Sequence, residues 1–408
     1  MKRIGLFLTA GPSGGGMFQY SQAILSALLA LPRKEYTQVV AYADPVWTEF
    51  LPAEVESLPL RLDRSLLSTA AIWVALGLSH KVWLRGAPLF FPVVRAIANK
   101  NCDLWIFPRQ DIWSSRFPVP ALAAVHDLMH HYEQHFPEVG GLGRQHYRQR
   151  YMQELVNCSL GILVDSPVGK QHVLESFKAD PEKVFTLPYV PPAYIYESKV
   201  SSDFDSKYHL TGKFLFYPAE FWPHKNHFRL IDAMARIRVS CSDIRLILAG
   251  YFGKGYSRVR SHVEKLGLHD HVHFAGYLPE ADMPEFYRRA RALVFPTFFG
   301  PTNIPPLEAF ALGCPVAASG IYGMPEQLGD AALLFDPRSE QEMADCIQRL
   351  WQDDDLCQRL SSNGLRKAQL WGPEQFASAF HAVIEQLAPA RAAARASSCS
   401  VAVPSLSR

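Results

Sequence analysis

The chain has few cysteines for its length, and none of them is spaced like a metal or redox motif. Seven cysteines are scattered over 408 residues, their number is odd, and no C-x-x-C pair occurs. Disulfide frameworks and zinc sites usually show paired or closely spaced cysteines, so neither is indicated. This cysteine usage fits the reducing environment of the cytoplasm.

Long apolar runs and an excess of one charge are also missing. No apolar stretch approaches the ~18–20 residues that span a bilayer. The basic start, MKR, precedes an apolar run of strand length, which predicts a first strand and not a signal peptide. Lysine and arginine number 41 against 39 aspartates and glutamates. Global charge therefore gives no argument for nucleic acid as a partner.

Short apolar runs alternate with amphipathic helical patterns in both halves of the chain. This alternation is typical of parallel sheets built from β-α-β units and predicts an α/β fold. In the first half we expect strands at 4–8, 39–43, 104–107, 122–125, 161–164 and 184–187. In the second half we expect them at 214–217, 245–249, 272–274, 292–295, 316–318 and 333–335.

The pattern divides the chain into two doubly wound domains facing across a cleft. We place the domains at 1–197 and 208–373, because the polar segment 198–207 between them lacks apolar periodicity and reads as a linker. Residues 374–387 read as a terminal helix. Residues 388–408 are rich in alanine and serine and contain no acid, which predicts a disordered tail. Ligands of such domains bind at the carboxyl ends of the strands.

The most informative segment runs from 294 to 337, through a strand, a turn, a helix and two further strands. Asn303 is a candidate N-cap for the helix, Pro305 and Pro306 suit its first turn, and Gly313 marks its end. Free N–H groups at a helix start favour an anion such as a diphosphate. The carboxylate of Glu308 can accept from two neighbouring hydroxyls, as a ribose offers. An ordinary buried strand–helix–strand unit is the alternative interpretation.

The motifs of this segment resemble a known family. They are Pro-Pro-Leu-Glu ending at Glu308, the pair Pro325-Glu326, and Gly-Asp-Ala-Ala at 329–332. They are similar to the nucleotide-sugar signature of the retaining glycosyltransferases of family four. The resemblance covers about residues 1–385. It implies the GT-B fold with two Rossmann-like domains, a nucleotide-sugar donor, no cofactor and no metal, and a terminal helix that crosses back onto the first domain. In that family the residue matching Glu308 holds the ribose.

The chain departs from the family pattern at two positions. The first glutamate of the family's pair, which lies near the donor sugar, falls on Gly300, so Thr302 and Asn303 become the nearest polar candidates for the sugar. Glu220 stands where the family usually has a phosphate-binding arginine. Either Lys225, the helix start and Arg229 supply the positive charge, or Glu220 points to sugar hydroxyls.

The remaining candidate residues follow other strands. The predicted catalytic residues are His126, Lys225 and Glu308. His126 matches the family's His-Asp-Leu motif, whose histidine approaches the donor sugar, so we expect it to contact the sugar hydroxyls through its ring or the sugar through its backbone. Lys225 suits a diphosphate. Asp127 either orients His126 or caps the next turn. His130, His131 and His135 show no metal-binding spacing. The predicted donor-binding residues are Gly15, Gly16, Glu220, Asn226, Gly276, Tyr277, Thr302, Asn303 and Ile304. Asn226 is also a candidate helix cap.

Residues 64–100 combine large apolar side chains with Arg64, Lys81, Arg85 and Arg95. Such a segment either packs in the core or lies on an anionic membrane surface. The latter would place the protein peripherally at the inner face of the cytoplasmic membrane.

The expected function is transfer of a sugar from a nucleoside diphosphate to a glycan or lipid-linked acceptor with retention of configuration, in cell-surface polysaccharide synthesis. The alternatives are a catalytically silent nucleotide-binding scaffold and a nucleotide-sugar epimerase of the same fold.

Overall fold

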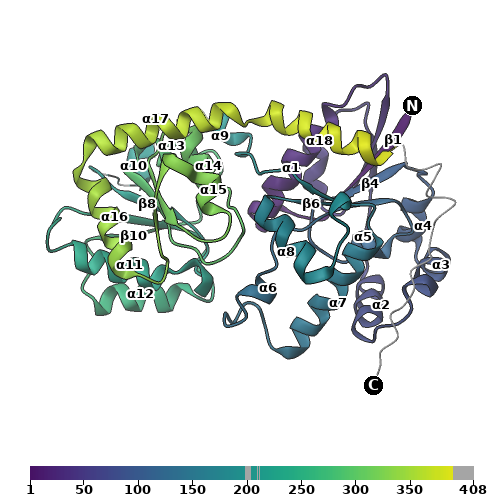
Figure 1. The fold of residues 1–408 in the computed structure, drawn as a ribbon, viewed down its shortest axis with the longest axis horizontal. Helices are drawn as coiled ribbons and strands as arrows, with labels where there is room; N and C mark the ends of the chain where they lie inside the picture. The colour runs from purple at the N-terminus through teal and green to yellow at the C-terminus, as the bar shows by residue number, and fades with distance from the viewer. Residues whose placement is uncertain (198–203, 209, 211, 389–408) are drawn as a thin grey trace.

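The computed structural model describes residues 1–197, 204–208, 210 and 212–388, and contains two parallel sheets (Figure 1). The predicted tail at 389–408 and most of the predicted linker, 198–203, lie outside the described residues. Every strand pair within both sheets is parallel. The predicted α/β class is therefore confirmed.

The first sheet has the order β3-β2-β1-β4-β5-β6-β7. Its strands are β1 (Lys2–Leu8), β2 (Tyr36–Tyr42), β3 (Glu56–Pro59), β4 (Leu104–Phe107), β5 (Ala121–Ala124), β6 (Gly161–Val164) and β7 (Val184–Thr186). All residues of β4, β5 and β6 are buried, because helices cover both faces of the sheet. The edge strand β3 was not predicted, since its residues alternate between half-buried and exposed and form no apolar run.

The second sheet has the order β10-β9-β8-β11-β12-β13. Its strands are β8 (Leu215–Pro218), β9 (Leu246–Ala249), β10 (Val272–Gly276), β11 (Ala292–Phe295), β12 (Val316–Ser319) and β13 (Ala332–Phe335). In each sheet the strand order reverses beside the first strand, at β1/β4 and at β8/β11. Crevices at such switch points are the usual ligand sites of doubly wound sheets.

Helices flank both sheets. The first domain has α1 (Gly16–Leu29), α2 (Arg64–Ala75), α3 (His80–Phe90), α4 (Pro92–Ala98), α5 (Trp113–Arg116), α6 (Met129–Tyr132), α7 (Leu142–Cys158), α8 (Pro167–Phe177) and α9 (Tyr194–Glu197). The second has α10 (Phe204–Tyr208), α11 (His227–Ile237), α12 (Tyr256–Lys265), α13 (Met283–Arg289), α14 (Pro305–Ala311), α15 (Met324–Leu328), α16 (Glu340–Gln352) and α17 (Asp354–Leu370). Short 3-10 turns lie at Pro12–Gly14, Pro45–Phe50, Pro181–Lys183, Pro223–Lys225 and Gly329–Ala331.

Helix α10 lies inside the segment predicted as a linker. Its Phe204 is buried and packs edge-on against Phe286 of α13, with ring centroids 5.1 Å apart. Phe204 therefore packs in the hydrophobic core of the second domain. The polar composition of the segment gave no sign of this contact.

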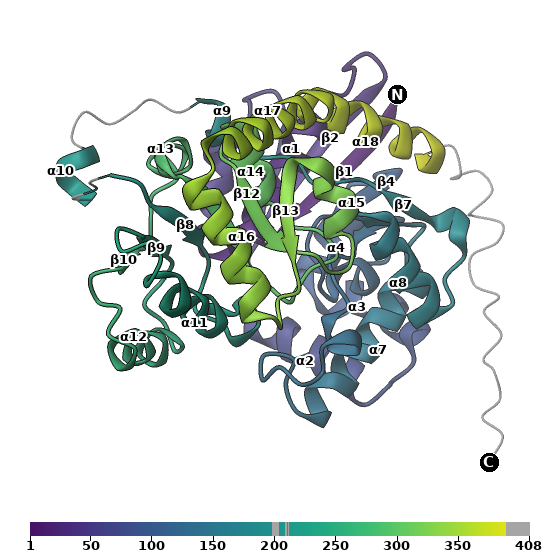
Figure 2. The ribbon, with the colours of Figure 1, turned by 60° about the vertical axis from the view of Figure 1, so that its left-hand side comes forward.

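The chain passes between the domains twice on one side of the molecule. The last helix, α18 (Pro373–Leu387), returns to the first domain and packs on α1 (Figures 1 and 2). Between α17 and α18, the indole N–H of Trp371 lies 3.3 Å from the carbonyl oxygen of Pro188 and 3.2 Å from that of Tyr189. These hydrogen bonds tie the returning chain to the outgoing one. We call this pair of crossings the hinge side.

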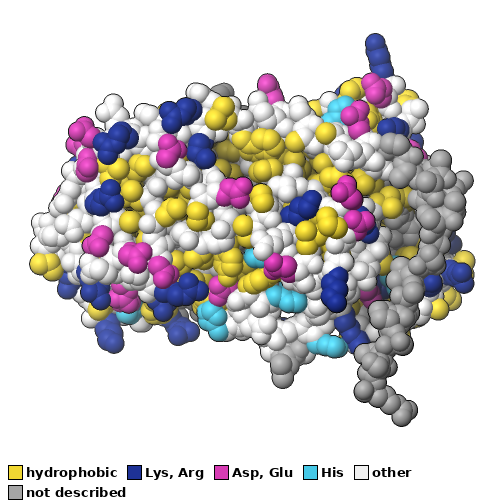
Figure 3. All heavy atoms as spheres, viewed as in Figure 1, with side chains coloured by type: hydrophobic (Ala, Val, Ile, Leu, Met, Phe, Trp, Pro, Cys, Tyr) yellow, Lys and Arg dark blue, Asp and Glu magenta, His cyan; other side chains and the backbone are white. Residues whose placement is uncertain are grey.

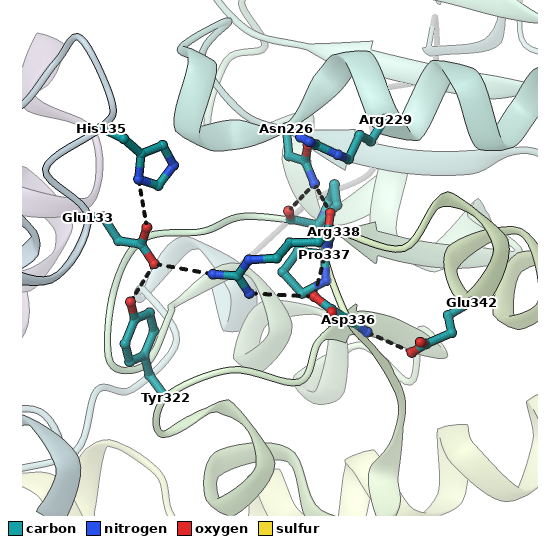
Figure 4. A network of polar contacts seen from close by, with 10 residues as sticks. Glu133, His135, Asn226, Arg229, Tyr322, Asp336, Pro337, Arg338 and Glu342 are labelled. Carbon is teal, nitrogen blue, oxygen red and sulfur yellow. Dashed lines mark hydrogen bonds and ion pairs between the residues drawn. The ribbon is translucent and has the colours of Figure 1, made fainter.

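A second set of interdomain contacts surrounds Glu133, which follows α6 (Figure 4). Its carboxylate accepts from the Tyr322 hydroxyl at 2.5 Å and lies 3.9 Å from the Arg338 guanidinium. Nearby, Glu138 accepts from both the backbone N–H (3.0 Å) and Nδ1 (2.9 Å) of His224. Carboxylates of the first domain thus hold the second domain on this side, which we call the clasp side.

Candidate active site

A cleft of about 740 Å³ lies between the domains, at the carboxyl ends of β1, β8 and β11. Its walls come from the glycine-rich turn after β1, the segment after β5, and the loops after β8, β9, β10 and β11. The cleft contains ten of the twelve predicted site residues: Gly15, Gly16, His126, Glu220, Lys225, Tyr277, Thr302, Asn303, Ile304 and Glu308. The topology brings them together, because parallel strands end on one edge of each sheet.

The glycine turn presents its backbone to the cleft. Gly15 has φ 53° and ψ −125°, a conformation that side chains rarely allow, and a Cβ there would meet nothing within 4 Å. Helix α1 begins at Gly16. Within the described chain, the N–H groups of Gly16 and Met17 have no hydrogen-bond partner, whereas the next two bond to the Gly15 carbonyl. The turn therefore offers two free N–H groups at the start of a long helix, which suits an anion.

Lys225 supplies a positive charge in the cleft. It ends the 3-10 turn after β8, and its Nζ lies 5.7 Å from the centroid of the Phe295 ring. No ion pair to Lys225 exists among the residues that the structure describes. Burial lowers the pKa of Lys225 to about 8, while Asp127 and Glu220 act in the opposite direction. A desolvated, uncompensated ammonium favours binding of a polyanion.

Glu308 is buried in the first turn of α14 and already has two partners. Its Oε1 accepts from the Tyr194 hydroxyl at 2.7 Å, and its Oε2 accepts from the Tyr287 hydroxyl at 2.5 Å. Gln19 of α1 donates in turn to the Tyr194 hydroxyl at 3.2 Å. Burial raises the pKa of Glu308, and the two tyrosine hydrogen bonds act against that rise. Each carboxylate oxygen keeps a second acceptor position for a ligand hydroxyl.

The start of α14 differs from the prediction. Asn303 is not the N-cap: its amide donates to the carbonyl of Phe299 at 3.2 Å, and Ile304 occupies the cap position without a side-chain bond. The backbone N–H of Thr302 donates to Asp165 and that of Asn303 to Gln327. Pro305 and Pro306 have no N–H group. At this helix start, within the described structure, only the Ile304 N–H therefore lacks a hydrogen-bond partner. This short helix is therefore a weaker anion site than the glycine turn.

The loop that lacks the family's first glutamate is held by the first domain. Gly300 has φ 91°, and a Cβ there would lie 2.8 Å from the Thr302 carbonyl oxygen. Asp165 accepts from both the N–H and the hydroxyl of Thr302. Burial raises the pKa of Asp165 to about 7. The Thr302 hydroxyl donates its proton to Asp165. Toward a sugar hydroxyl it can therefore act only as a hydrogen-bond acceptor.

The His126 ring does not face the cleft as a free group. Its Nε2 lies 2.8 Å from the carbonyl oxygen of Pro108 and its Nδ1 lies 2.9 Å from the Tyr189 hydroxyl. A carbonyl can only accept, so Nε2 carries the proton and Nδ1 accepts from the tyrosine. Burial lowers the His126 pKa, which keeps the ring neutral. Both ring nitrogens therefore bond within the protein, and the backbone N–H of His126 also donates to the side-chain oxygen of Gln110 at 2.6 Å. The expected contact of His126 with a donor sugar, through its ring or its backbone, stays a prediction.

Two predicted donor-binding residues lie outside the cleft lining. Asn226 is buried with φ 62° and does not cap α11; its amide donates to the carbonyls of Pro296 (3.1 Å) and Pro337 (2.8 Å), tying the ends of β11 and β13 together. A buried amide must satisfy its hydrogen-bonding groups, and these carbonyls do so. The carbonyl of Gly276 accepts from the Gly250 N–H.

Arg229 was considered as a source of charge for the diphosphate. It also lies outside the lining, with its guanidinium 3.4 Å from the Asn226 oxygen (Figure 4). Asp127 caps the turn at Met129 (3.1 Å) and does not contact the His126 ring. Among the described residues, no group of three or more His, Cys, Asp or Glu side chains could hold a metal ion.

Glu220 and four aromatic residues line the rest of the second-domain wall. Glu220 accepts from the backbone N–H of Tyr251 at 3.3 Å. Trp222, Tyr251, Tyr277 and Phe299 line the cleft, whereas Phe221 is buried.

Sequence reasoning missed Gln19, Asp165, Tyr194 and Tyr287. Only Asp165 follows a strand end, directly after β6, so only this residue had a positional signal. The other three sit on helices. Tyr287 reaches Glu308 through packing within the second domain, whereas Tyr194 and its partner Gln19 come from the first domain and depend on how the domains meet.

The family comparison matches residues 201–367 to the model described as glycosyl transferases group 1. O-antigen chain mannosyltransferase B of Escherichia coli is 27% identical over 242 residues, which cover 57% of this chain and 62% of that protein. O-antigen chain mannosyltransferase RfbU of Salmonella typhimurium is 26% identical over 364 residues, covering 86% of this chain and 92% of that protein. The chain thus spans less than two thirds of the first relative and most of the second.

Solved structures show the same fold at low identity. Sucrose-phosphate synthase from Thermosynechococcus elongatus superimposes with a TM-score of 0.70 at 18% identity, covering 96% of this chain and 100% of that chain. Anabaena HepE, solved with UDP-glucose, gives a TM-score of 0.69 at 18% identity, covering 95% and 100%. The predicted GT-B fold is confirmed, and the family model matches the second domain, where the motifs of the predicted resemblance lie.

Proposed function

We propose that this protein transfers a hexose from a nucleoside-diphosphate sugar to a glycan or lipid-linked saccharide, because residues 201–367 match the glycosyl transferases group 1 model and the chain has the GT-B fold. The observation that carries the proposal is the convergence of three groups on one cleft: the free N–H groups of the glycine turn, the uncompensated Lys225, and the Glu308 carboxylate. The names of the two relatives favour mannose as the sugar and an O-antigen-type polysaccharide as the product.

The three groups match the parts of such a donor. The diphosphate lies between Lys225 and the N–H groups of Gly16 and Met17, and the ribose hydroxyls donate to the open positions of Glu308. Lys225 stabilises the negative charge that grows on the leaving diphosphate. With this charge supplied by the protein, we propose that transfer needs no metal ion, so a chelator such as EDTA should leave the rate unchanged.

We further propose that transfer retains the configuration of the sugar. The bond from the anomeric carbon to the diphosphate breaks, and the acceptor oxygen forms its bond on the same face. The acceptor's proton passes to the departing diphosphate oxygen. The protein contributes positioning and charge stabilisation. An NMR measurement of the anomeric coupling in donor and product tests this stereochemistry.

The direct test is incubation of purified protein with a panel of nucleoside-diphosphate sugars and a lipid-linked acceptor, with products read by mass spectrometry. Lys225→Ala should remove most product, whereas Lys265→Ala, an exposed lysine on α12, should remove none. The same assay decides the alternative of a catalytically silent scaffold, which the missing carboxylate at Gly300 favours. Binding without turnover of any sugar would establish that alternative, and sugar interconversion without transfer would establish an epimerase.

We also propose that α2, α3 and α4 place the protein on an anionic lipid surface. Residues 64–100 contain five lysines and arginines and no acid. One side of these helices packs in the core through Trp83 and Ala87, but Leu76, Leu89 and Phe90 are 64%, 73% and 77% exposed. Over the rest of the face shown in Figure 3, both charge signs are interspersed. No helix of the described chain is long and apolar enough to span a bilayer.

Co-sedimentation with phosphatidylglycerol vesicles tests this surface. The double variant Leu89→Ser/Phe90→Ser should lose vesicle binding, because each exposed apolar side chain contributes about 1.5–3 kcal/mol when buried in lipid. Val239→Ser, which changes an 86% exposed apolar residue on the second domain, is the matched control. Equal binding by all three proteins would refute the proposal.

A further inference from the structure

Two exposed tyrosines form a platform on the second-domain wall of the cleft. Tyr251 follows β9 and Tyr277 follows β10, and their ring centroids lie 5.0 Å apart at 42°. The two residues are 58% and 56% exposed, and both line the cleft. Exposed rings at a cleft wall offer a stacking surface for a flat heterocycle, because every nucleobase has a π face.

Glu280 lies beside this platform, in the turn after β10, and lines the cleft. Its charge acts electrostatically on Tyr277, Tyr194 and Glu308, which line the same cleft. No hydrogen bond or ion pair to Glu280 occurs within the described residues. The Glu280 side chain is exposed to solvent, and its partial desolvation in the cleft raises its pKa.

A carboxylate can only accept hydrogen bonds, so it selects a ligand edge that presents donors. Guanine presents two adjacent donors, the N1–H and the 2-amino group. Uracil presents one N–H between two carbonyl oxygens, and a carboxylate repels those oxygens. Adenine presents its amino group beside a ring nitrogen that is itself an acceptor.

We propose that Glu280 recognises guanine through the N1–H and 2-amino groups while the base stacks on Tyr251 and Tyr277, so that the donor is a guanosine-diphosphate sugar. This inference rests on the proposed function, since it names the base of the nucleotide that Glu308 and Lys225 hold. Glu280 acts as a specificity-determining residue of the donor site.

Calorimetric titration of the full chain with GDP, IDP, UDP and ADP tests the proposal. IDP is the sharpest probe, because it lacks only the 2-amino group. Wild type should bind GDP about tenfold or more tighter than IDP, and bind UDP and ADP more weakly still. Glu280→Gln should bind GDP and IDP with affinities within a few-fold of each other. Its amide has one acceptor oxygen for the N1–H, and its NH2 group would face the 2-amino group, donor against donor.

Glu264→Gln, at an exposed glutamate on α12, is the matched control and should keep the wild-type order. Equal binding of GDP and IDP by wild type, or tighter binding of UDP or ADP, overturns the base assignment. If a uridine or adenosine diphosphate sugar is then turned over, the proposed function still stands. Failure to bind any nucleoside diphosphate overturns both.

Discussion

The two walls of the cleft differ in their free charges, although Glu220 and Glu308 on the second-domain wall are hydrogen-bonded within the protein. On the first-domain wall, both nitrogens of His126 bond within the protein, Asp127 caps a turn, and Asp165 holds Thr302. On the second-domain wall, Lys225 and Glu280 have no hydrogen-bond or ion-pair partner in the described chain. A charge kept uncompensated in a partly buried cleft costs stability, and a ligand that compensates it recovers that cost. The second wall therefore supplies side-chain charges to an ionic ligand, whereas the first supplies the free N–H groups of the glycine turn.

The largest effect should come from Lys225→Ala. We expect transfer to fall by about 10²–10³-fold, because removal of one preorganised group that stabilises transition-state charge has that magnitude. Nucleoside diphosphate affinity should also fall, while affinity for the nucleoside without phosphates should stay within a few-fold. Equal losses for nucleoside and diphosphate would place Lys225 away from the phosphates.

Glu308→Ala should weaken nucleotide binding by roughly a hundredfold, since two charge-assisted hydrogen bonds to the ribose are lost and water replaces them in part. Calorimetry with ribo- and 2′-deoxyribonucleotides measures this directly. Wild type should prefer the ribose form and the variant should lose that preference. Tyr287→Phe is the control for the buried network, because it removes a partner of Glu308 without removing the carboxylate. An unchanged ribose preference in Glu308→Ala would exclude the assigned contact.

Diphosphate affinity should depend on pH through Lys225. Its pKa of about 8 lies below the usual lysine value, and the ammonium is charged below that pKa. We therefore expect constant affinity below about pH 8 and a loss approaching tenfold per pH unit above it. Titration of Lys225→Arg over the same range is the control, since a guanidinium stays charged. A parallel decline in that variant would assign the pH dependence to another group.

His126→Phe should have the smallest effect on binding. The change removes two internal hydrogen bonds and leaves buried partners unsatisfied, so the free energy of unfolding should fall by about 1–3 kcal/mol. The nucleoside diphosphate dissociation constant should stay within a few-fold of wild type. Chemical denaturation and calorimetry on the same samples separate the two quantities. A large loss of affinity at unchanged stability would show that the ring contacts the ligand.

The sequence predicted the fold well because its signals are local. The fully buried strands β4, β6 and β11 are continuous apolar runs, and their predicted and observed boundaries are identical. Strand ends then located Lys225 and the glycine turn, since parallel topology fixes the edge on which they meet. Strand β3 was not predicted, because an edge strand with alternating exposure has no continuous apolar run.

What the sequence could not predict was which polar groups were already engaged. The partners of His126 lie 18 and 63 residues away, and Thr302 and Asp165 are 137 residues apart. Cap preferences favoured Asn303 and Asn226, but both amides bond to carbonyls made available by tertiary packing. Residue type and strand position identify a candidate; only the packing of distant segments decides whether it is free to bind.

The hinge side and the clasp side together define how the cleft can open. The two crossings, fastened by Trp371, fix the domains along one side, so relative motion reduces to rotation about an axis near them. Displacement in such a rotation grows with distance from the axis. The contacts of Glu133 and Glu138 would then separate first and farthest, while the Trp371 hydrogen bonds change least. A long donor can enter through the side that carries the carboxylates, and each opening must break the same few polar contacts, which gives the cleft a defined closed position to return to.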